Sequence, residues 1–156
     1  MSRLWTVEVP HWHPTSLNRL TGNPWESRRR KKADALHVAL FLARAGVPRV
    51  SYPRSQLRAA KRRKIDLLSV LPPIEPIRRR LDVEILLAPE ERDRQGRWVK
   101  GGQEYDSDNL SKSLRDALVE GGWLVDDSPK WLVSGEPRQR RADRTATVIT
   151  IEDLHA

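Results

Sequence analysis

The stretch from Asp108 to Gly122 constrains the fold of this chain most strongly, because it predicts one helix with a defined buried side. Apolar residues recur along it at helical spacing, and Gly121-Gly122 follows where a helix commonly ends. The apolar stripe consists of Leu110, Leu114, Ala117 and Leu118. A helix with such a stripe must pack its apolar side on another element, so the chain needs at least a second layer.

Strand patterns elsewhere supply that second layer. Within "RRRLDVEILLAP" the residues that fall on one face are Leu81, Val83, Ile85 and Leu87. "WTVEV" at the N-terminus alternates in the same way and ends at Pro10, and "TATVITIE" predicts a last strand. A shorter strand is expected within "WLVSGE", paired with the last strand as a hairpin, and "RQRRADR" between them is expected to be a basic loop.

A second helix is predicted within "NPWESRRRKKADALHVALFLARAGVP". Pro24 suits its first turn, and Gly46 with Pro48 would end it. The residues expected to share its apolar face are Leu36, Ala39, Leu40 and Ala43. The predicted order is therefore β-α-insert-β-α-β-β, an α+β fold with a small mixed sheet and two main helices. With 156 residues, a single domain spanning 1–156 is expected.

Residues 49–75 give the least definite pattern and are treated as a basic insertion. "SQLRAAKRRKIDLLSVL" is compatible with another helix, closed by Pro72-Pro73, and equally with a partly ordered insertion. Its cations at 58–64 are candidate phosphate contacts, as are those at 78–80 and 138–144. Because these alternatives rest on the same residues, the sequence leaves the role of 49–75 open.

The charge balance points to a polyanionic partner. The chain has 29 Lys+Arg against 21 Asp+Glu, a net charge of +8, which favours nucleic acid over an acidic membrane surface. It has no cysteine, which excludes disulfides and thiolate metal sites. No stretch has the apolar length of a membrane span and no signal peptide is recognised, so a cytoplasmic location is expected and no membrane partner.

Two acidic groups stand out in this basic chain, one at each end of the helix first described. Asp106 and Asp108 lie at its start, and Asp126-Asp127 follow its glycine stop and "WLV". The connecting residues are long enough in extended form to bring the second group back beside the helix start. Converging carboxylates repel one another unless a cation lies among them, and Mg²⁺ prefers such oxygen ligands.

The same residues also admit structural roles. Asp108 is a good N-cap, and Asp108, Lys112 and Asp116 follow the spacing of a helix salt-bridge ladder. The sequence Asp126-Asp127-Ser128-Pro129 is an ordinary turn. A metal-dependent nuclease and a non-catalytic DNA-binding protein with a capped helix are therefore both compatible with these residues.

A family resemblance bears on this choice. "DSDNLSKSLRDAL" followed by "GGWLVDD" resembles the RusA-type Holliday junction resolvases, whose pattern is D-x-D-N-x-x-K-x-x-x-D-A-L, a small-residue turn, an apolar triplet and D-D. The strong part of this resemblance covers residues 106–127. "HPTSLN" is similar to the proline-rich entry of the family, which makes Asn18 a weaker match.

The resemblance implies specific roles for the matched residues. Asp106, Asp108 and Asp127 would hold Mg²⁺, with Mn²⁺ as an alternative, and Asp126 would be a neighbour or an alternative ligand. Lys112 would be the essential lysine, so the implied catalytic residues are Asp106, Asp108, Asp127 and Lys112. Asn109 would support the site or the DNA. No nucleotide cofactor is implied, and the partner would be four-way branched DNA bound by a homodimer.

The expected DNA contacts extend beyond the matched motif. They are Asn18, Tyr105, Asn109, Lys112, Arg78, Arg79 and Arg80. Tyr105 stands where the family often carries basic residues, so it would stack on an unpaired base or pack inside. The expected function is a Mg²⁺-dependent endodeoxyribonuclease that resolves Holliday junctions by paired nicks in DNA recombination and repair, in a bacterial cytoplasm or that of a phage host. A related nuclease acting on forks or flaps is the alternative of the same fold.

Overall fold

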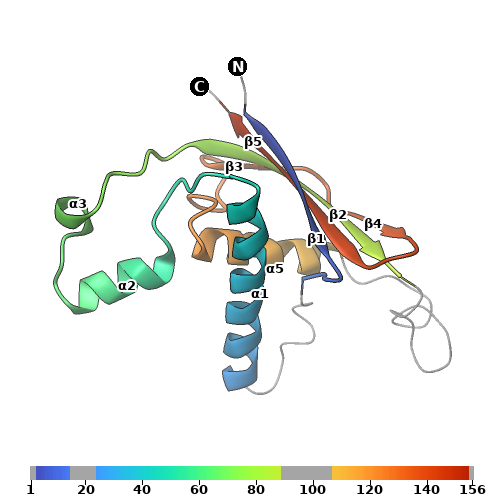
Figure 1. Ribbon diagram of the computed structural model, residues 1–156, viewed down its shortest axis with the longest axis horizontal. Helices are drawn as coiled ribbons and strands as arrows, with labels where there is room; N and C mark the ends of the chain where they lie inside the picture. Colours follow the sequence, from blue (N-terminus) through green and yellow to red (C-terminus); the bar gives the residue numbers. More distant parts are fainter. Residues whose placement is uncertain (1–2, 15–23, 89–106, 155–156) are drawn as a thin grey trace.

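The computed structural model describes residues 3–14, 24–88 and 107–154. Within these described residues nine elements follow one another (Figure 1). They are β1 (Leu4–Pro10), α1 (Pro24–Arg44), α2 (Arg54–Arg62), α3 (Leu67–Val70), β2 (Arg78–Leu87), α5 (Ser107–Glu120), β3 (Leu132–Ser134), β4 (Arg138–Arg141) and β5 (Ala146–Leu154). This mixture of helices with one small mixed sheet confirms the predicted α+β class.

The sheet is built around β2. Strand β5 lies antiparallel between β2 and β1, while β3 and β4 pair in parallel with the other edge of β2. The predicted hairpin is therefore wrong, since β2 separates β3 from β5. The predicted basic loop is also wrong in its first half, because residues 138–141 form β4. An edge strand tolerates these charges, since its arginines point to solvent.

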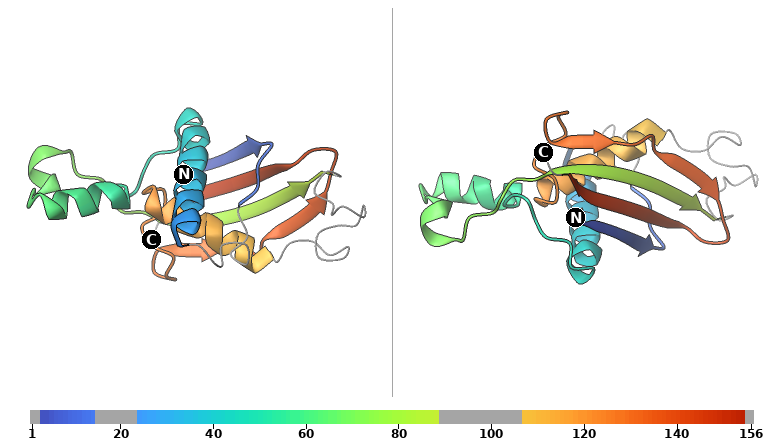
Figure 2. Two further views of the ribbon diagram at one scale, coloured as in Figure 1. Left: turned by 90° about the horizontal axis from the view of Figure 1, so that it is seen from below. Right: turned by 90° about the horizontal axis from the view of Figure 1, so that it is seen from above.

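One face of the sheet is covered by α1 and α5, and the other faces water (Figure 2). Alternation in β2 accounts for this, because one set of its side chains is buried and the set between is exposed or half-buried, apart from Leu86. The predicted face of this strand is confirmed, with Leu81, Val83, Ile85 and Leu87 all buried. Of the predicted side of α5, Leu114, Ala117 and Leu118 are buried, while the side chain of Leu110 lies outside the described residues.

Helix α1 turns a different side to the core than its spacing suggested. Leu36 is 66% exposed and Leu40 47% exposed, whereas Val38 and Leu42 are buried at 1% and 0%. The predicted face is therefore wrong for Leu36, Leu40 and Ala43, while Ala39 is half-buried and packs against the core. Almost every residue from Ala35 to Ala43 is apolar, so periodicity alone does not distinguish two competing sides. Contact with α5 and the sheet selects the side that carries Val38 and Leu42.

The C-terminal end of α5 requires a glycine. Gly122 has φ +81°, a left-handed conformation, and a Cβ atom there would lie 2.3 Å from the carbonyl oxygen of Ser51. Its own carbonyl oxygen accepts hydrogen bonds from the backbone N–H groups of Val50 and Ser51, at 2.9 and 3.2 Å. The predicted stop is confirmed, and the same residue fastens the start of the insertion to α5.

The insertion forms two short helices, α2 and α3, and not one. Residues 53–71, called the α2–α3 arm below, extend away from the sheet and the main helices (Figures 1 and 2). The break falls between Arg62 and Leu67, where Lys64 adopts φ +55°. In the described residues no helix is long and apolar enough to cross a membrane.

Candidate active site

Helix α5 carries the first part of the predicted site at its N-terminal turns. Asp108 and Asn109 lie in its first turn, while their side chains, together with Asp106, Tyr105 and Asn18, lie outside the described residues. Lys112 is exposed, and its neighbours Ser111 and Ser113 are buried at 4% and 5%, so the lysine projects from the outer side of the helix. Backbone N–H groups at a helix start favour negative charge, which suits both carboxylates and phosphate.

The second acidic group lies in the connection between α5 and β3, residues 121–131. Here an oxygen of the Asp126 carboxylate accepts a hydrogen bond from the backbone N–H of Asp127, at 2.9 Å. Asp126 is half-buried and Asp127 is exposed. One carboxylate therefore shapes the turn, and the other faces solvent, where an oxygen ligand for a cation would be accessible.

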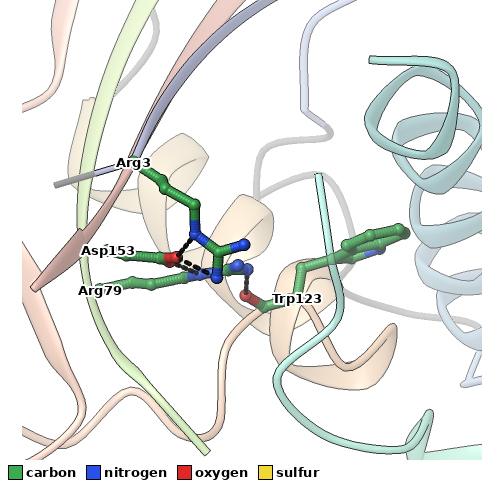
Figure 3. Close-up of polar contacts among 4 residues, drawn as sticks. All are labelled: Arg3, Arg79, Trp123 and Asp153. Atoms are coloured by element: carbon green, nitrogen blue, oxygen red, sulfur yellow. Dashed lines mark hydrogen bonds and ion pairs between the residues drawn. The ribbon is translucent and has the colours of Figure 1, made fainter. Parts of the chain in front are cut away.

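Arg79, expected to contact DNA, is instead buried and forms part of the core. It is 0% exposed, and its Nε donates to Asp153 Oδ1 at 2.7 Å while its Nη1 donates to the backbone oxygen of Trp123 at 2.8 Å (Figure 3). Arg3 donates to the other oxygen of Asp153 at 3.0 Å. Burial lowers the pKa of Arg79, and the hydrogen bond and charge of Asp153 oppose that shift. The predicted DNA contact of Arg79 is corrected on these grounds, because phosphate cannot reach a guanidinium held inside the fold.

Arg79 and its neighbour hold the acidic connection at the start of β2. The Arg79 backbone N–H donates to the oxygen of Trp131 at 3.0 Å, and Arg78 Nη2 donates to the oxygen of Pro129 at 3.1 Å. With the bond to Trp123, both ends of the connection are fixed to these two residues.

The connection therefore stays by the C-terminal end of α5, as both views show (Figures 1 and 2). A helix of 14 residues is about 20 Å long, so the helix start and this connection stand at opposite ends of α5. The expectation that "GGWLV" returns the acidic turn to the helix start of the same chain is not met. The described residues do not include Asp106 or the side chain of Asp108, and among them no group of three His, Asp or Glu side chains is placed to hold a metal ion.

Arg78 and Arg80 remain candidates for DNA contact. Arg78 is exposed, and the side chain of Arg80 is 49% exposed with Glu152 at 3.5 Å. Because alternate residues of a strand point to opposite faces, these two lie on the outer face while Arg79 points inward. Three adjacent arginines thus divide into two surface cations and one internal anchor. The inward side chain follows from the alternation of β2, a signal that the sequence already contained.

Sequence reasoning missed the polar group that organises the site. Asp153 belongs to no recognised sequence motif, yet it is 0% exposed and forms ion pairs with both Arg79 and Arg3. Arg49 was also unremarked, although its Nε donates to the oxygen of Gly121 at 3.0 Å and its Cζ lies 4.3 Å from the centre of the Trp123 ring. These contacts join residues far apart in sequence, so no local pattern indicated them.

Comparison with known families identifies this arrangement. The family model described as Endodeoxyribonuclease RusA matches residues 41–152, which is more than half of the chain and includes α5, the acidic connection, β2, β3, β4 and most of β5. A search of curated proteins gives no match. The match covers the D-x-D-N motif, Lys112 and Asp126-Asp127 together. The chain therefore belongs to the RusA family of Holliday junction resolvases, and it is an endodeoxyribonuclease, a hydrolase that acts on DNA.

Proposed function

We propose that this protein is a Mg²⁺-dependent enzyme that resolves four-way DNA junctions by paired nicks, in DNA recombination and repair. The observation that carries the proposal is the placement of the family motif. Asp108 falls in the first turn of α5, the lysine of the motif is exposed one turn further on, and its last aspartate is exposed in the next connection. The lysine and the last aspartate are thus accessible to a phosphodiester.

The donor set fits a hard divalent cation. Asp106, Asp108 and Asp127 would supply only carboxylate oxygens, which Mg²⁺ prefers, and the chain has no cysteine for softer metals. Mn²⁺ accepts the same ligands and is the alternative. A cation bound there would neutralise phosphate charge and lower the pKa of a bound water. Asp127 is the better ligand of the acidic pair, because Asp126 already accepts the backbone bond of the turn.

The other residues of the motif would bind and orient the DNA. The ammonium of Lys112 projects from α5 into solvent, where it can pair with a phosphate and stabilise negative charge that develops on it. Asn109, Tyr105 and Asn18 would contribute hydrogen bonds or stacking close to the nick. Arg78 and Arg80 would bind backbone phosphate without reading sequence, which suits recognition of a branched shape.

A homodimer would bring together the two acidic groups, which lie apart within one chain. The helix start and the acidic connection stand at opposite ends of α5. Two chains related by a two-fold axis would let Asp106 and Asp108 of one chain face Asp127 of the other. Such a dimer would contain two equivalent sites, the number needed to nick two opposed strands.

Cleavage of a synthetic four-way junction tests the proposal directly. The wild-type protein should nick opposed strands with Mg²⁺ and not without it, and Asp108→Asn should abolish nicking. Asp106→Asn should also abolish nicking while junction binding is retained or strengthened, because the change removes negative charge near phosphate. Cleavage without added metal, or cleavage unaffected by Asp108→Asn, would contradict the proposed site.

A comparison of DNA substrates distinguishes a junction resolvase from a related nuclease that acts on forks or flaps. Forks, flaps and plain duplexes of the same sequence should be cut more slowly than the junction if paired nicking of junctions is the function. Faster cutting of forks or flaps would assign the protein to that substrate class instead. The non-catalytic alternative is disfavoured, because the family to which the chain belongs consists of endodeoxyribonucleases.

A further inference from the structure

The α2–α3 arm carries a dense group of positive charge on the described surface outside the candidate site, and the five consecutive exposed cations at 28–32 of α1 form another. Between residues 53 and 66 the arm has six cations against Asp66, and all six are exposed. They are Arg54, Arg58, Lys61, Arg62, Arg63 and Lys64. The last four are consecutive and occupy the end of α2 and the bend that follows; this tetrad is called the arm tip below.

Fold stability accounts for only part of this charge. Arg58 pairs with Glu120 of α5, and Lys61 and Arg62 lie in the last turn of α2, where cations favour the helix dipole. Arg63 and Lys64 lie beyond that turn. Adjacent like charges repel one another, so the stability of α2 alone does not explain their presence.

Lys64 is unfavourable for the backbone as well. It adopts φ +55°, and its N–H donates to the oxygen of Lys61 at 3.2 Å, while Ile65 N–H donates to Ala60 oxygen at 2.9 Å. This is the position after a helix where glycine is preferred, and a residue with a Cβ costs about 1 kcal/mol there. Glycine would satisfy the same hydrogen bonds without that cost. A cation is therefore present where local folding favours its absence, which points to a ligand for the charge.

The arm is fastened to the same part of the fold as the acidic connection. Arg58 binds α5 through Glu120, and the chain just before the arm is bonded to the glycine stop of α5 at Gly121 and Gly122. The hydroxyl of Tyr52 donates to the oxygen of Pro72, which closes the base of the arm. Because the acidic connection begins at Gly121, the base of the arm and the connection are fastened to the same end of α5.

A second basic region, a cavity of about 700 Å³ between α1, the arm base and α5, fits a polyanion less well. Its cations share the cavity with the carboxylates of Asp34, Asp116 and Glu120. The arm tip has no carboxylate within its own four residues, and it lies away from the sheet and main helices (Figure 1). The arm tip is therefore a cluster of cations outside that cavity of mixed charge.

We propose that the arm tip, Lys61 to Lys64, binds the sugar-phosphate backbone of one duplex arm of the DNA substrate, away from the strand that is nicked. The inference rests on the branched-DNA function proposed above and assigns a role to the insertion. Extended duplex is the polyanion that an enzyme of this family meets, and four clustered cations on a projecting segment match its regularly spaced phosphates. The contact adds affinity and orientation, and takes no part in hydrolysis.

Salt dependence of junction binding tests the inference. Binding is measured by fluorescence anisotropy in EDTA, so that no cleavage occurs, on junctions with long arms and with arms cut back close to the crossover. Arg63→Gln with Lys64→Gln should weaken binding to the long-armed junction and lower the slope of log K against log salt by about 1.8, since each lost phosphate contact removes about 0.9. Binding to the short-armed junction should be unchanged.

A matched variant controls for net charge. Arg29→Gln with Arg44→Gln removes two exposed cations of α1 and should leave the slope unchanged. Lys64→Gly should raise the thermal midpoint, because it relieves the left-handed lysine, and yet weaken long-arm binding. Lys64→Arg should preserve binding. A loss of affinity together with a gain of stability cannot arise from misfolding.

Three outcomes would overturn the inference. They are an unchanged salt slope, an equal loss on long-armed and short-armed junctions, and a fall in the molecular mass of the Arg63→Gln, Lys64→Gln variant, which would show that the tip binds a second copy. Failure of the wild-type protein to bind any junction would instead refute the proposed function. Normal junction binding with no difference between the tip variant and its control would refute only this role of the arm.

Discussion

At the residue scale, Arg79 shows how one side chain serves the site without touching substrate. It lies between two exposed arginines, yet it is buried against Asp153 and binds the backbone of the acidic connection. A buried charge of this kind is tolerated only when it is paired and hydrogen-bonded. The position of Asp126 and Asp127 therefore depends on an ion pair deep in the fold.

Asp153→Asn should destabilise the protein by about 3–5 kcal/mol, because it leaves the charge of Arg79 buried without its partner. Urea unfolding followed by tryptophan fluorescence measures the loss. Its neighbour Glu152, 26% exposed in its side chain and 3.5 Å from Arg80, is the control, and Glu152→Gln should cost less than about 1 kcal/mol. Equal effects of the two changes would show that the buried pair does not stabilise the fold.

Gly122→Ala should destabilise the protein well beyond the cost of its backbone conformation. The left-handed φ alone costs a residue with a Cβ about 1–2 kcal/mol, and the Ser51 oxygen at 2.3 Å adds a clash. Gly46 is the matched control, because its φ is +78° and a Cβ added there would meet no atom within 4 Å. In thermal unfolding, Gly46→Ala should lose only the stability that the backbone conformation costs. Gly122→Ala should lose clearly more stability than that.

At the element scale, α1 has two apolar sides and buries only one. Leu42 is fully buried against the sheet and α5, whereas Leu40 is 47% exposed. Exposed leucines on one side of a helix are a candidate contact surface for the second chain of the proposed homodimer. The stability of the folded chain depends on the opposite side of α1, which carries Val38 and Leu42.

Leu42→Ala should lower the free energy of unfolding by about 2–5 kcal/mol, because it opens a cavity in the core. Leu40→Ala should cost less than about 1 kcal/mol in the folded subunit, since solvent already reaches that side chain. Urea unfolding at low protein concentration measures both. Comparable losses would mean that α1 packs with its Leu40 side inward.

At the scale of the whole molecule, the separation of the two acidic groups makes subunit mixing informative. Asp108→Asn and Asp127→Asn proteins should each be inactive on a four-way junction. If Mg²⁺ is held between subunits, a mixed dimer of the two variants contains one site with every aspartate intact. Mixing should then restore single nicks, which supercoiled plasmid carrying a cruciform reports as open circles. No recovery after verified subunit exchange would mean that each site lies within one chain.

The sequence by itself determined the class of the fold and the kind of enzyme. Strand alternation in β2, the stripe and glycine stop of α5, and the spacing of Asp108, Lys112 and Asp127 are local features. They are readable because helix and strand periods are fixed by backbone geometry. The family match confirmed the kind of enzyme that this motif indicated.

Only the tertiary structure decided which of several equivalent patterns is used. It selected the Val38 side of α1 over the Leu40 side, placed β2 between β3 and β5, and turned Arg79 inward to Asp153. Each choice depends on partners distant in sequence, whose combined burial and pairing outweigh local preference. For the same reason the acidic connection remains beside the start of β2, because Arg79 holds it there.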